Sequence, residues 1–538
     1  MFPVLTHSET NPDPSWTIGA PRRDGGIDLP LIVRSAVDTR AKTRTWLASA
    51  LAVACIAGVT VLVFSPTRHN GFLQLTFDDQ LILDDPDVRQ VDWAHAGNLI
   101  TEFRHANYVP LTMLTFALQY RFSGFEPAPY HVVNVLLHAT TAILLFVFLR
   151  PLVGSPWLAA LAALIFAVHP LQLEAVSLAI QRKTLLSGAL FFVALIGYQH
   201  WCRTRSRGAY AAALLAFTAA AAAKPTVVTL PLVLMLYDYV FVGAHVRLAD
   251  KLPFFAVAAV FSAAAMAASH AVGAIYPPHG GSWPAHTLVA ARATMESVAA
   301  LFLPLTLSPI YYYRPGTQYD VLNFIALAGL ILLVAFVTLR RRQDPWSFFC
   351  VWWFILALLP QSNIFPLAQL RPDRYLYLSI AGFALWCAVA LDRLARSNAF
   401  GSRWRLAAAA TGCLFVAMLA GITYRSASIW RSDVSAWQRV VERHPWCATA
   451  HTMLGRAYHA RGEGEAAERL YLDAMHLNAS VADPYLYLAK LYAENGLPER
   501  AEMFARQFLD RAPGNPEGIA LLRSVSGQAP ERVAGPVP

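Results

Sequence analysis

The stretch HVVNVLLHATTAILLFVFL (131–149) contains no Asp, Glu, Lys or Arg, and Arg150 follows it directly. A helix of about 20 apolar residues crosses the hydrocarbon core of a bilayer, so this stretch is predicted to be a transmembrane helix. His131, Asn134 and His138 lie at helical spacing on one face of it. An interhelical hydrogen-bond network and a substrate contact explain this polar face equally well. The stretch thus predicts a helical membrane domain.

Apolar runs of this kind fill the chain up to residue 423. Of the 538 residues, 56% are hydrophobic and 14% are charged, whereas a soluble domain carries about 25% charged residues. The predicted fold class is therefore all-α, with about eleven transmembrane helices in a domain over 46–423 and a large outer loop at 65–130. The first run lacks a small-residue cleavage site, so it is expected to stay in place. The other runs are 46–64, 157–169, 184–200, 210–223, 226–241, 253–270, 321–339, 346–360, 375–391 and 406–423.

Arginine and lysine gather in alternate loops between these runs. The positive-inside rule puts such loops in the cytoplasm. The pattern predicts a disordered cytoplasmic tail at 1–45 and places the C-terminal segment on the outer side. It also accounts for the net charge of +9, which therefore does not indicate a nucleic-acid partner. The basic loop residues are Arg150, Arg203, Arg205, Arg207, Arg247, Lys251, Arg340, Arg341, Arg342, Arg393, Arg396, Arg403 and Arg405.

Three further features receive structural interpretations. The apolar segment 288–303 contains Arg292 and Glu296, so we expect an interfacial or re-entrant helix on the outer side. Tyr311, Tyr312 and Tyr313 favour an aromatic belt at the membrane surface over a platform for sugar binding. The six cysteines show neither CxxC nor metal-ligand spacing and are expected to be inert.

The C-terminal part of the chain repeats with a period of 34 residues. When Ala448 is the first position of a unit, its small and large residues match the tetratricopeptide pattern, and a second unit follows in phase from Ala482. We therefore predict tetratricopeptide repeats over 432–525 and a flexible tail at 526–538. The matching residues of the first unit are Leu454, Gly455, Tyr458, Ala467, Tyr471 and Ala474.

An acidic pair, Asp78 and Asp79, lies in the outer loop after the first helix. Such a pair often caps a helix or keeps a loop soluble. A carboxylate near cations at a membrane surface also suits transfer of a sugar from a polyprenyl phosphate, because it can take the acceptor proton while the cations stabilise the departing phosphate. The other outer loops supply His169, Glu174, Arg182, Lys224, Arg371, Arg374 and Tyr375 as candidate substrate-binding residues. Nothing in the sequence indicates a metal site.

Five segments in this region resemble the transmembrane and tetratricopeptide-repeat-containing protein O-mannosyltransferases, a family of GT-C-fold enzymes. The resemblance extends in the same order to the repeats. It departs from the family pattern at Lys224-Pro225, where Lys-Glu is common, and at Val109-Pro110-Leu111, where Arg-Pro-Leu is usual. The segments are FDDQLILDDPDV (77–88), PYHVVNVLLHA (129–139), IFAVHPLQLEAVSLAIQRKTLLSG (165–188), KPTVVTLPLVLMLYD (224–238) and DRYLYLSIAGF (373–383).

This resemblance implies a polyprenyl- or dolichyl-phosphate-mannose donor, an inverting reaction and a protein Ser/Thr acceptor. It implies that Asp78 and Asp79 form the catalytic motif, with Asp78 as the base. It also aligns His169, Glu174 and Arg182 with the family's HPxxxEAV segment and the arginine after it. No cofactor is implied beyond the lipid-linked sugar, and the need for a divalent metal stays open.

The combined expectation is a membrane glycosyltransferase. It would pass a sugar such as mannose from a polyprenyl phosphate to a protein Ser/Thr or glycan hydroxyl, at the periplasmic face of a bacterial inner membrane. The repeats would hold the acceptor protein in their concave groove. Two alternatives remain, a transporter and a non-catalytic scaffold. Transporter sites usually lie at the bilayer midplane, whereas the polar residues here gather at one membrane face.

Overall fold

The computed structural model describes residues 39–75, 77–90, 92–104, 107–243, 247–274, 276–396 and 403–527. Most of the predicted tails, namely 1–38 and 528–538, lies outside these residues. The prediction of a disordered tail is wrong for 39–45, which form the first turns of a helix because they continue into the first apolar run. Helices make up the fold, and the described residues contain no strand, only an isolated bridge between Arg104 and Asn107. The predicted all-α fold class is confirmed.

All eleven apolar runs form helices. In the described part of the chain, seven helical segments are long and apolar enough to cross a membrane, or eight if α7 and the bent segment after it form one span. The chain is therefore a multi-pass integral membrane protein. Because α10 and α15 are apolar but shorter, the count of about eleven crossings stays a prediction. The bundle consists of α1 (Thr39–Phe64), α6 (Pro127–Val153), α7 (Pro156–Val168), α9 (Arg182–Thr204), α10 (Arg207–Ala223), α11 (Leu230–Tyr237), α12 (Leu252–Ala271), α14 (Val321–Leu339), α15 (Pro345–Leu358), α16 (Ser379–Arg396) and α17 (Arg403–Ser426).

Local sequence explains where these helices begin and end. Pro127 and Pro156 stand in the first turns of α6 and α7, where a missing N–H costs no hydrogen bond. The Ser155 hydroxyl accepts a hydrogen bond from the N–H of Leu158 at 3.4 Å and so caps α7. Gly154, with φ of +69°, ends α6 in the left-handed conformation that glycine adopts readily. The chain can therefore reverse sharply between two membrane helices.

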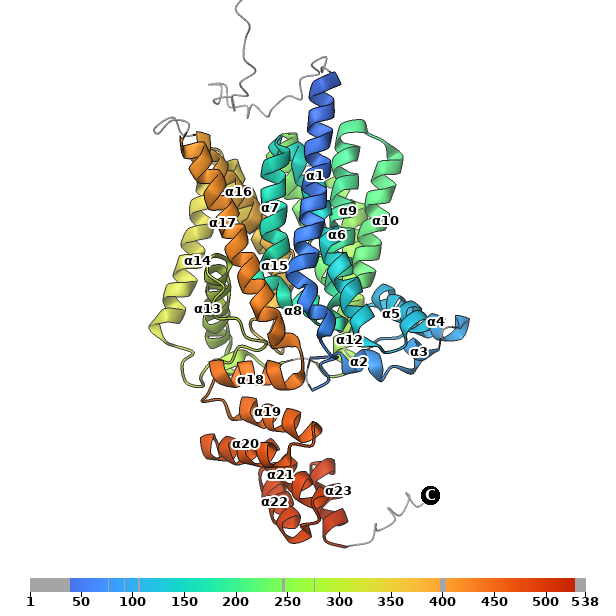
Figure 1. The fold of residues 1–538 in the computed structure, drawn as a ribbon, viewed down its shortest axis with the longest axis vertical. Coiled ribbons are helices and arrows are strands. Elements are labelled where there is room, and N and C mark those ends of the chain that lie inside the picture. Colours follow the sequence, from blue (N-terminus) through green and yellow to red (C-terminus); the bar gives the residue numbers. More distant parts are fainter. Residues whose placement is uncertain are drawn as a thin grey trace, which may run out of the picture.

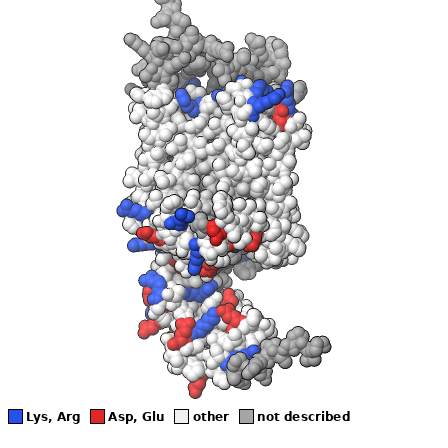
Figure 2. All heavy atoms as spheres, turned by 90° about the vertical axis from the view of Figure 1, so that its right-hand side faces the viewer, with Lys and Arg blue, Asp and Glu red and all other residues white. Residues whose placement is uncertain are grey.

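The bundle has a buried centre and a lipid-facing rim. Most of α9 is buried, whereas α12, α14 and α17 keep most of their apolar side chains exposed. Exposed apolar side chains of this kind are stable only against lipid or a partner. Figure 2 shows, on the face toward the viewer, a belt of uncharged residues over the bundle, with mainly Lys and Arg at one end and mixed charges toward the other. This belt matches the region that a bilayer would cover.

Several shorter helices gather at the end of the bundle from which the C-terminal helices extend (Figure 1), and we call this end the tail face. Helix α5 belongs to the segment predicted to be a large outer loop. The predicted interfacial or re-entrant segment at 288–303 lies in α13, which is not among the seven helices that meet the criterion for crossing. These helices are α2 (Gln80–Leu83), α3 (Pro86–Arg89), α4 (Trp93–Thr101), α5 (Pro110–Ser123), α8 (Leu173–Ser177) and α13 (Trp283–Phe302).

Ten short 3₁₀ or π turns connect or extend the described helices. They are η1 (Ser65–His69), η2 (Pro170–Gln172), η3 (Ala179–Gln181), η4 (Pro225–Val227), η5 (Asp238–Val242), η6 (Leu248–Lys251), η7 (His279–Gly281), η8 (Leu359–Gln361), η9 (Asp373–Leu376) and η10 (Ala427–Trp430).

The C-terminal helices form antiparallel pairs beyond the tail face (Figure 1). Two of them, α20 and α22, begin 34 residues apart, which is the predicted repeat length. The assignment to the tetratricopeptide class stays a prediction. The helices are α18 (Asp433–Arg443), α19 (Ala448–Ala460), α20 (Gly464–Leu477), α21 (Asp483–Glu494), α22 (Pro498–Arg511) and α23 (Pro516–Val525).

The apolar core does not stop at the end of the bundle. One continuous cluster of buried side chains runs from α1 to Ala457 in α19, and a second cluster begins at Ala467 in α20. The first two C-terminal helices therefore share their core with the membrane helices.

A candidate active site at the tail face

The two acids of the predicted catalytic pair lie in different environments. Asp79 is completely buried, and its carboxylate accepts hydrogen bonds from the N–H groups of Leu73, at 3.1 Å, and Ile180, at 2.8 Å. Burial raises the pKa of Asp79 to about 7, although both hydrogen bonds oppose this rise. Asp79 thus ties the loop after α1 to the segment that precedes α9.

Asp78 is exposed and stands in the left-handed region with φ of +68°. This conformation is uncommon for residues other than glycine. Its conformational energy is unfavourable, so it persists only where surrounding contacts fix the backbone. The neighbouring Asp79 provides two such fixing bonds. The Asp78 carboxylate lies close enough to Lys183, Arg374 and Tyr375 to interact with them electrostatically. Asp78 is therefore the member of the pair that a substrate can reach.

Glu174 and Arg374 form the central ion pair of the site. Glu174 lies in α8 and is 2% exposed; its carboxylate pairs with the Arg374 guanidinium and accepts the Arg374 backbone N–H at 2.9 Å. Although burial opposes it, this carboxylate raises the pKa of Arg374, which therefore stays charged. The same guanidinium reaches Gln369 at 3.4 Å and lies 5.4 Å from the centre of the Tyr375 ring.

Two lysines extend this cluster. The ammonium group of Lys224 donates to the Thr184 hydroxyl at 2.9 Å. Burial, and then the like charges of Lys183 and Arg374, lower the pKa of Lys224 well below its ordinary value, while Glu174 opposes them. Within the described part of the chain, Lys183 forms no hydrogen bond or ion pair, although it is only 7% exposed. Lys183, Lys224 and Arg374 thus lie near one another, and of these three only Arg374 is paired with a carboxylate within the described part of the chain.

Arg371 belongs to a second cluster beside the first. Its guanidinium contacts Glu296 at 3.4 Å and Ser297 at 3.2 Å, and it lies over the Tyr311 ring at 4.2 Å. The Tyr311 hydroxyl in turn donates to the Asp373 carboxylate at 3.1 Å. Burial raises the pKa of Asp373 to about 7, against the effect of Arg371.

The three consecutive tyrosines are part of this polar region. The hydroxyl of Tyr313 donates to Glu296 at 2.9 Å, and Tyr311 is bonded to Asp373. The backbone N–H of Tyr312 lies 3.5 Å from the imidazole of His444, in the segment after α18. Two of the hydroxyl groups thus bind acids of the membrane domain, and Tyr312 contacts the segment after α18; the aromatic belt itself stays a prediction.

Two predicted substrate-binding residues are held away from the cluster. The Arg182 guanidinium lies over the rings of Phe116, at 4.4 Å, and Tyr130, at 5.3 Å, and it pairs with Gln119. It therefore faces α5 and α6, and the adjacent Lys183 is the residue that faces Asp78. The imidazole of His169 is fully buried and uses both ring nitrogens in contacts with backbone groups. Both residues pack the protein rather than line the site.

For two of the three residues on the polar face of the second membrane helix, the structure shows interhelical hydrogen bonds. Asn134 donates to the carbonyl of Leu178 at 2.8 Å. His138 contacts the Tyr377 hydroxyl at 3.0 Å and the carbonyl of Ala167 at 2.9 Å. These bonds join α6 to its neighbours, so Asn134 and His138 belong to an interhelical network.

The first C-terminal helix holds the loop that carries the acid pair. The Asp433 carboxylate, at the start of α18, accepts the backbone N–H groups of Gln74 at 3.1 Å and Leu75 at 3.2 Å. The ring of Phe77 packs against Trp437 with centroids 5.7 Å apart. Helix α18 therefore helps to set the position of Asp78.

Sequence reasoning did not identify Lys183, Asp373 or Asp433 as parts of this region. Both Lys183 and Asp373 stand in the segments that carry the family resemblance, which was the signal available for them. No comparable signal marks Asp433. In the described residues, no group of three His, Cys, Asp or Glu side chains is arranged to hold a metal ion.

Comparisons with known proteins agree with the predicted resemblance. No family model matches the chain. Protein O-mannosyl-transferase tmtc2 of Xenopus laevis is 41% identical over 110 residues, which are 20% of this chain and 13% of that protein. Protein O-mannosyl-transferase TMTC3 of Homo sapiens is 34% identical over 167 residues, 29% of this chain and 17% of that protein. Protein O-mannosyl-transferase TMTC4 of Homo sapiens is 31% identical over 166 residues, 27% of this chain and 22% of that protein.

The aligned part thus spans less than a quarter of the length of each of these relatives. Over these aligned residues the chain is similar to the TMTC protein O-mannosyl-transferases, in agreement with the resemblance that the motifs predicted.

Proposed function

We propose that the protein is a GT-C-type membrane glycosyltransferase that transfers a sugar, such as mannose, from a polyprenyl phosphate to a Ser or Thr hydroxyl of an acceptor protein. One observation carries this proposal: the exposed carboxylate of Asp78 faces a cluster of cations formed by Lys183, Lys224 and Arg374. The names of the relatives agree with a protein acceptor and with mannose.

The cations suit the phosphate of the donor. Lys183 has no partner in the described residues, and Lys224 is crowded by two like charges. A phosphate bound between them would stabilise the charged form of Lys224 and form charge-assisted hydrogen bonds with both lysines. Arg374 is already oriented by Glu174, so it could contact the same phosphate with little loss of side-chain entropy. The binding of an anion therefore relieves the repulsion built into this cluster.

The proposed reaction then needs one base. The acceptor hydroxyl oxygen attacks C1 of the sugar, its proton passes to the Asp78 carboxylate, and the bond from C1 to the phosphate oxygen breaks on the opposite side. A new glycosidic bond forms, and the polyprenyl phosphate leaves with the electron pair of the broken bond. Lys183, Lys224 and Arg374 stabilise the negative charge on that phosphate. Such a displacement inverts the configuration at C1.

The rest of the molecule supports an acceptor that comes from outside the membrane. The candidate site and the C-terminal helices lie at the same end of the bundle (Figure 1). We assign this end to the periplasmic side of a bacterial inner membrane, because arginine and lysine dominate the opposite end (Figure 2). The repeats would hold the acceptor protein in their concave groove.

Replacement of Asp78 by Asn tests the proposal. The variant keeps the side-chain size and removes the base, so transfer from a labelled polyprenyl-phosphate mannose should fall by about 10²–10⁴-fold. Its melting temperature should stay that of the wild type, because the side chain is exposed. The measurement is turnover by purified protein in detergent or nanodiscs.

Asp84→Asn is the matched control, since Asp84 is also an exposed acid of the same loop and should tolerate the change. Its neighbour Asp85 is unsuitable as a control, because its carboxylate accepts a hydrogen bond from the N–H of Asp87 and pairs with Arg104 at 3.2 Å. Full transfer by the Asp78→Asn variant would rule out the proposed base. A wild-type protein that neither hydrolyses nor transfers from any polyprenyl-phosphate sugar would support the scaffold alternative.

A further inference from the structure

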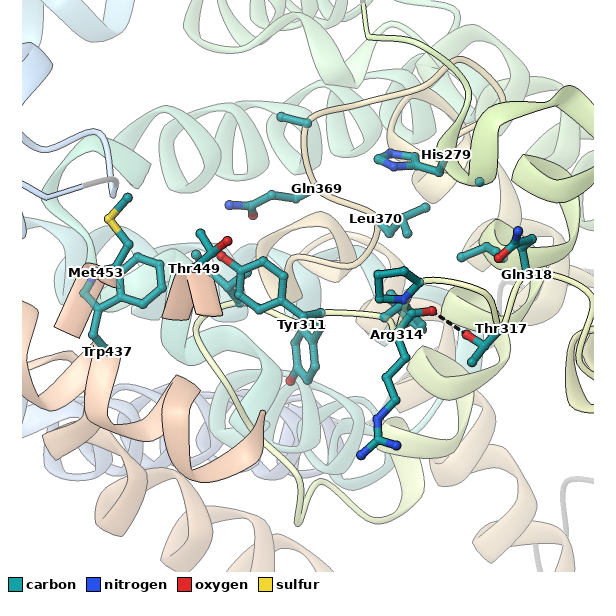
Figure 3. A pocket seen from close by; sticks show the side chains of 17 residues that line it. His279, Tyr311, Arg314, Thr317, Gln318, Gln369, Leu370, Trp437, Thr449 and Met453 are labelled. Atoms are coloured by element: carbon teal, nitrogen blue, oxygen red, sulfur yellow. Dashed lines mark hydrogen bonds between the residues drawn. The ribbon is translucent and has the colours of Figure 1, made fainter. Parts of the chain in front are cut away.

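A cavity of about 610 Å³ lies at the junction between the membrane domain and the C-terminal helices. Figure 3 shows Trp437, Thr449 and Met453 from α18 and α19 on one side of it, and Arg314, Thr317 and Gln318 on the other. A cavity of about 300–1,000 Å³ accommodates a ligand the size of a short peptide. The remaining lining residues are His279, Gly280, Val289, Ile310, Tyr311, Tyr312, Tyr313, Pro315, Ala368, Gln369 and Leu370.

This cavity adjoins the candidate active site through three of its lining residues. Gln369 accepts a hydrogen bond from Arg374 at 3.4 Å, and Tyr311 donates one to the carboxylate of Asp373. On the other side, Trp437 packs against Phe77, the residue directly before Asp78. A molecule in the cavity is therefore one side chain away from the loop that carries the proposed base and from the central ion pair.

The chemistry of the wall favours a peptide as the occupant. Arg314 is the one lining residue that is charged at neutral pH, so the cavity is poorly suited to a phosphate. The wall holds no Asp or Glu, although carboxylates are the strongest acceptors for the hydroxyl groups of a sugar. Four tyrosine and tryptophan rings and several aliphatic side chains match the side chains of an extended chain.

Unused donors in the wall match the backbone of such a chain. The indole N–H of Trp437 is buried, and no described residue accepts a hydrogen bond from it. A peptide carbonyl that reached this donor would give it a partner. Gln369 uses its side-chain oxygen toward Arg374, so its amide N–H groups also remain for a ligand.

We infer that this cavity seats an extended segment of the acceptor protein and presents its Ser or Thr hydroxyl to Asp78. The inference rests on the proposed function for the identity of the reaction, but the binding of a peptide can be tested without turnover. The cavity would contact the few residues on either side of the acceptor Ser or Thr. The more distant repeats would bind the rest of the acceptor.

Photocrosslinking gives the direct test. A benzophenone amino acid is placed at Thr317 in the cavity and, as a control, at Thr287, an exposed threonine of α13 outside it. Each protein is irradiated with a library of decapeptides that have threonine at the centre, and adducts are identified by mass. The inference predicts peptide adducts at position 317 and none above background at position 287. Equal adducts at both positions, or none at 317, overturn it, and so do adducts with mannan oligosaccharides instead of peptides.

A kinetic test uses the same control position. Thr449→Trp fills the cavity from α19, so KM for peptides found active with the wild type should rise at least about tenfold, while hydrolysis of the donor in the absence of peptide stays unchanged. Thr287→Trp is the matched control and should alter neither value. Peptide adducts together with an absence of donor turnover would contradict the proposed function alone. Donor turnover without adducts, or an unchanged KM in Thr449→Trp, would contradict the cavity alone.

Discussion

At the scale of single residues, neighbouring positions with the same chemistry have different tasks. Asp78 is exposed toward the cations, whereas Asp79 is buried and holds backbone groups. Likewise Arg182 packs against aromatic rings, while Lys183 faces Asp78. In both pairs the backbone turns between the two residues, so one side chain enters the core and the next reaches the site.

The environment of Asp79 predicts a pH-dependent contribution to stability. Its pKa is about 7 in the folded protein, above the ordinary value of 3.8, so the folded state keeps a proton that the unfolded chain has already lost. The resulting stabilisation is complete below about pH 4 and disappears as the pH rises through 7, by at most about 1.4 kcal/mol per pH unit. The melting temperature of the wild type should fall over this range.

Asp79→Asn should make that fall smaller. Asp373 also has a pKa of about 7, so part of the slope should remain in the variant. Asn offers one acceptor oxygen in place of two, so one of the N–H groups of Leu73 and Ile180 loses its partner. The melting temperature at pH 5 should therefore drop as well. Thermal scans in detergent from pH 4 to 8 measure both effects, and a slope equal to that of Asp84→Asn would contradict this account of Asp79.

The residue types of the site could be predicted from the sequence. Which member of each adjacent pair faces the site, and which one is buried, could not. Five predicted residues, Asp78, Glu174, Lys224, Arg374 and Tyr375, come together in the structure. Which of two adjacent side chains faces the site depends on the local turn and on partners far along the chain. Asp79 bonds to Ile180 across 101 positions, and Asp433 bonds to Gln74 across 359. Sequence spacing carries no information about such pairs.

At the scale of elements, the long apolar runs predicted helices well, because each must satisfy its own backbone hydrogen bonds inside a membrane. That argument does not predict how α18 packs. Its pattern predicts an amphipathic repeat helix, yet its apolar face packs into the core that it shares with the membrane helices. An amphipathic pattern shows that a helix has a buried face without showing what covers that face.

This packing predicts different results for two truncations. A chain that ends at Asn478 keeps α18, α19 and α20, so it should hydrolyse the donor within about twofold of the full chain and still modify short peptides, because repeat units contact mainly their neighbours. Transfer to a folded acceptor protein should fall at least about tenfold, since α21 to α23 are missing.

A chain that ends at Arg431 should lose donor hydrolysis as well. It lacks Asp433 and Trp437, so the N–H groups of Gln74 and Leu75 lose their acceptor and Phe77 loses part of its packing. The test measures donor hydrolysis and thermal stability of both truncations and of the full chain. Equal activity of the two truncations would show that α18 does not position the loop.

At the scale of the whole molecule, the first and the last described helices lie at opposite ends of the bundle. Helix α1 begins at one end, and the C-terminal helices extend from the other (Figure 1). This arrangement requires an odd number of crossings. Lys and Arg gather at the end where α1 begins (Figure 2), and under the positive-inside rule this supports the proposed orientation, with that end in the cytoplasm and the tail face outside.

Labelling of single cysteines in intact spheroplasts tests this topology. The six native cysteines are first replaced, since Cys55 and Cys413 are exposed and could react themselves. A cysteine at Ser480, in the C-terminal part, should react with a membrane-impermeant thiol reagent before lysis. A cysteine at Gln343, in the exposed basic loop between α14 and α15, should react only after lysis.

The same experiment tests whether α13 crosses the membrane. Cysteines at the exposed positions Tyr276 and Tyr319 lie before and after this helix. Both should react before lysis, because the ion pair of Arg292 and Glu296 makes a crossing by α13 costly and keeps the helix at the tail face. If position 319 became reactive only after lysis, α13 would cross the membrane. Labelling of position 343 before lysis, or of position 480 only after lysis, would place the candidate site on the wrong side for a periplasmic acceptor.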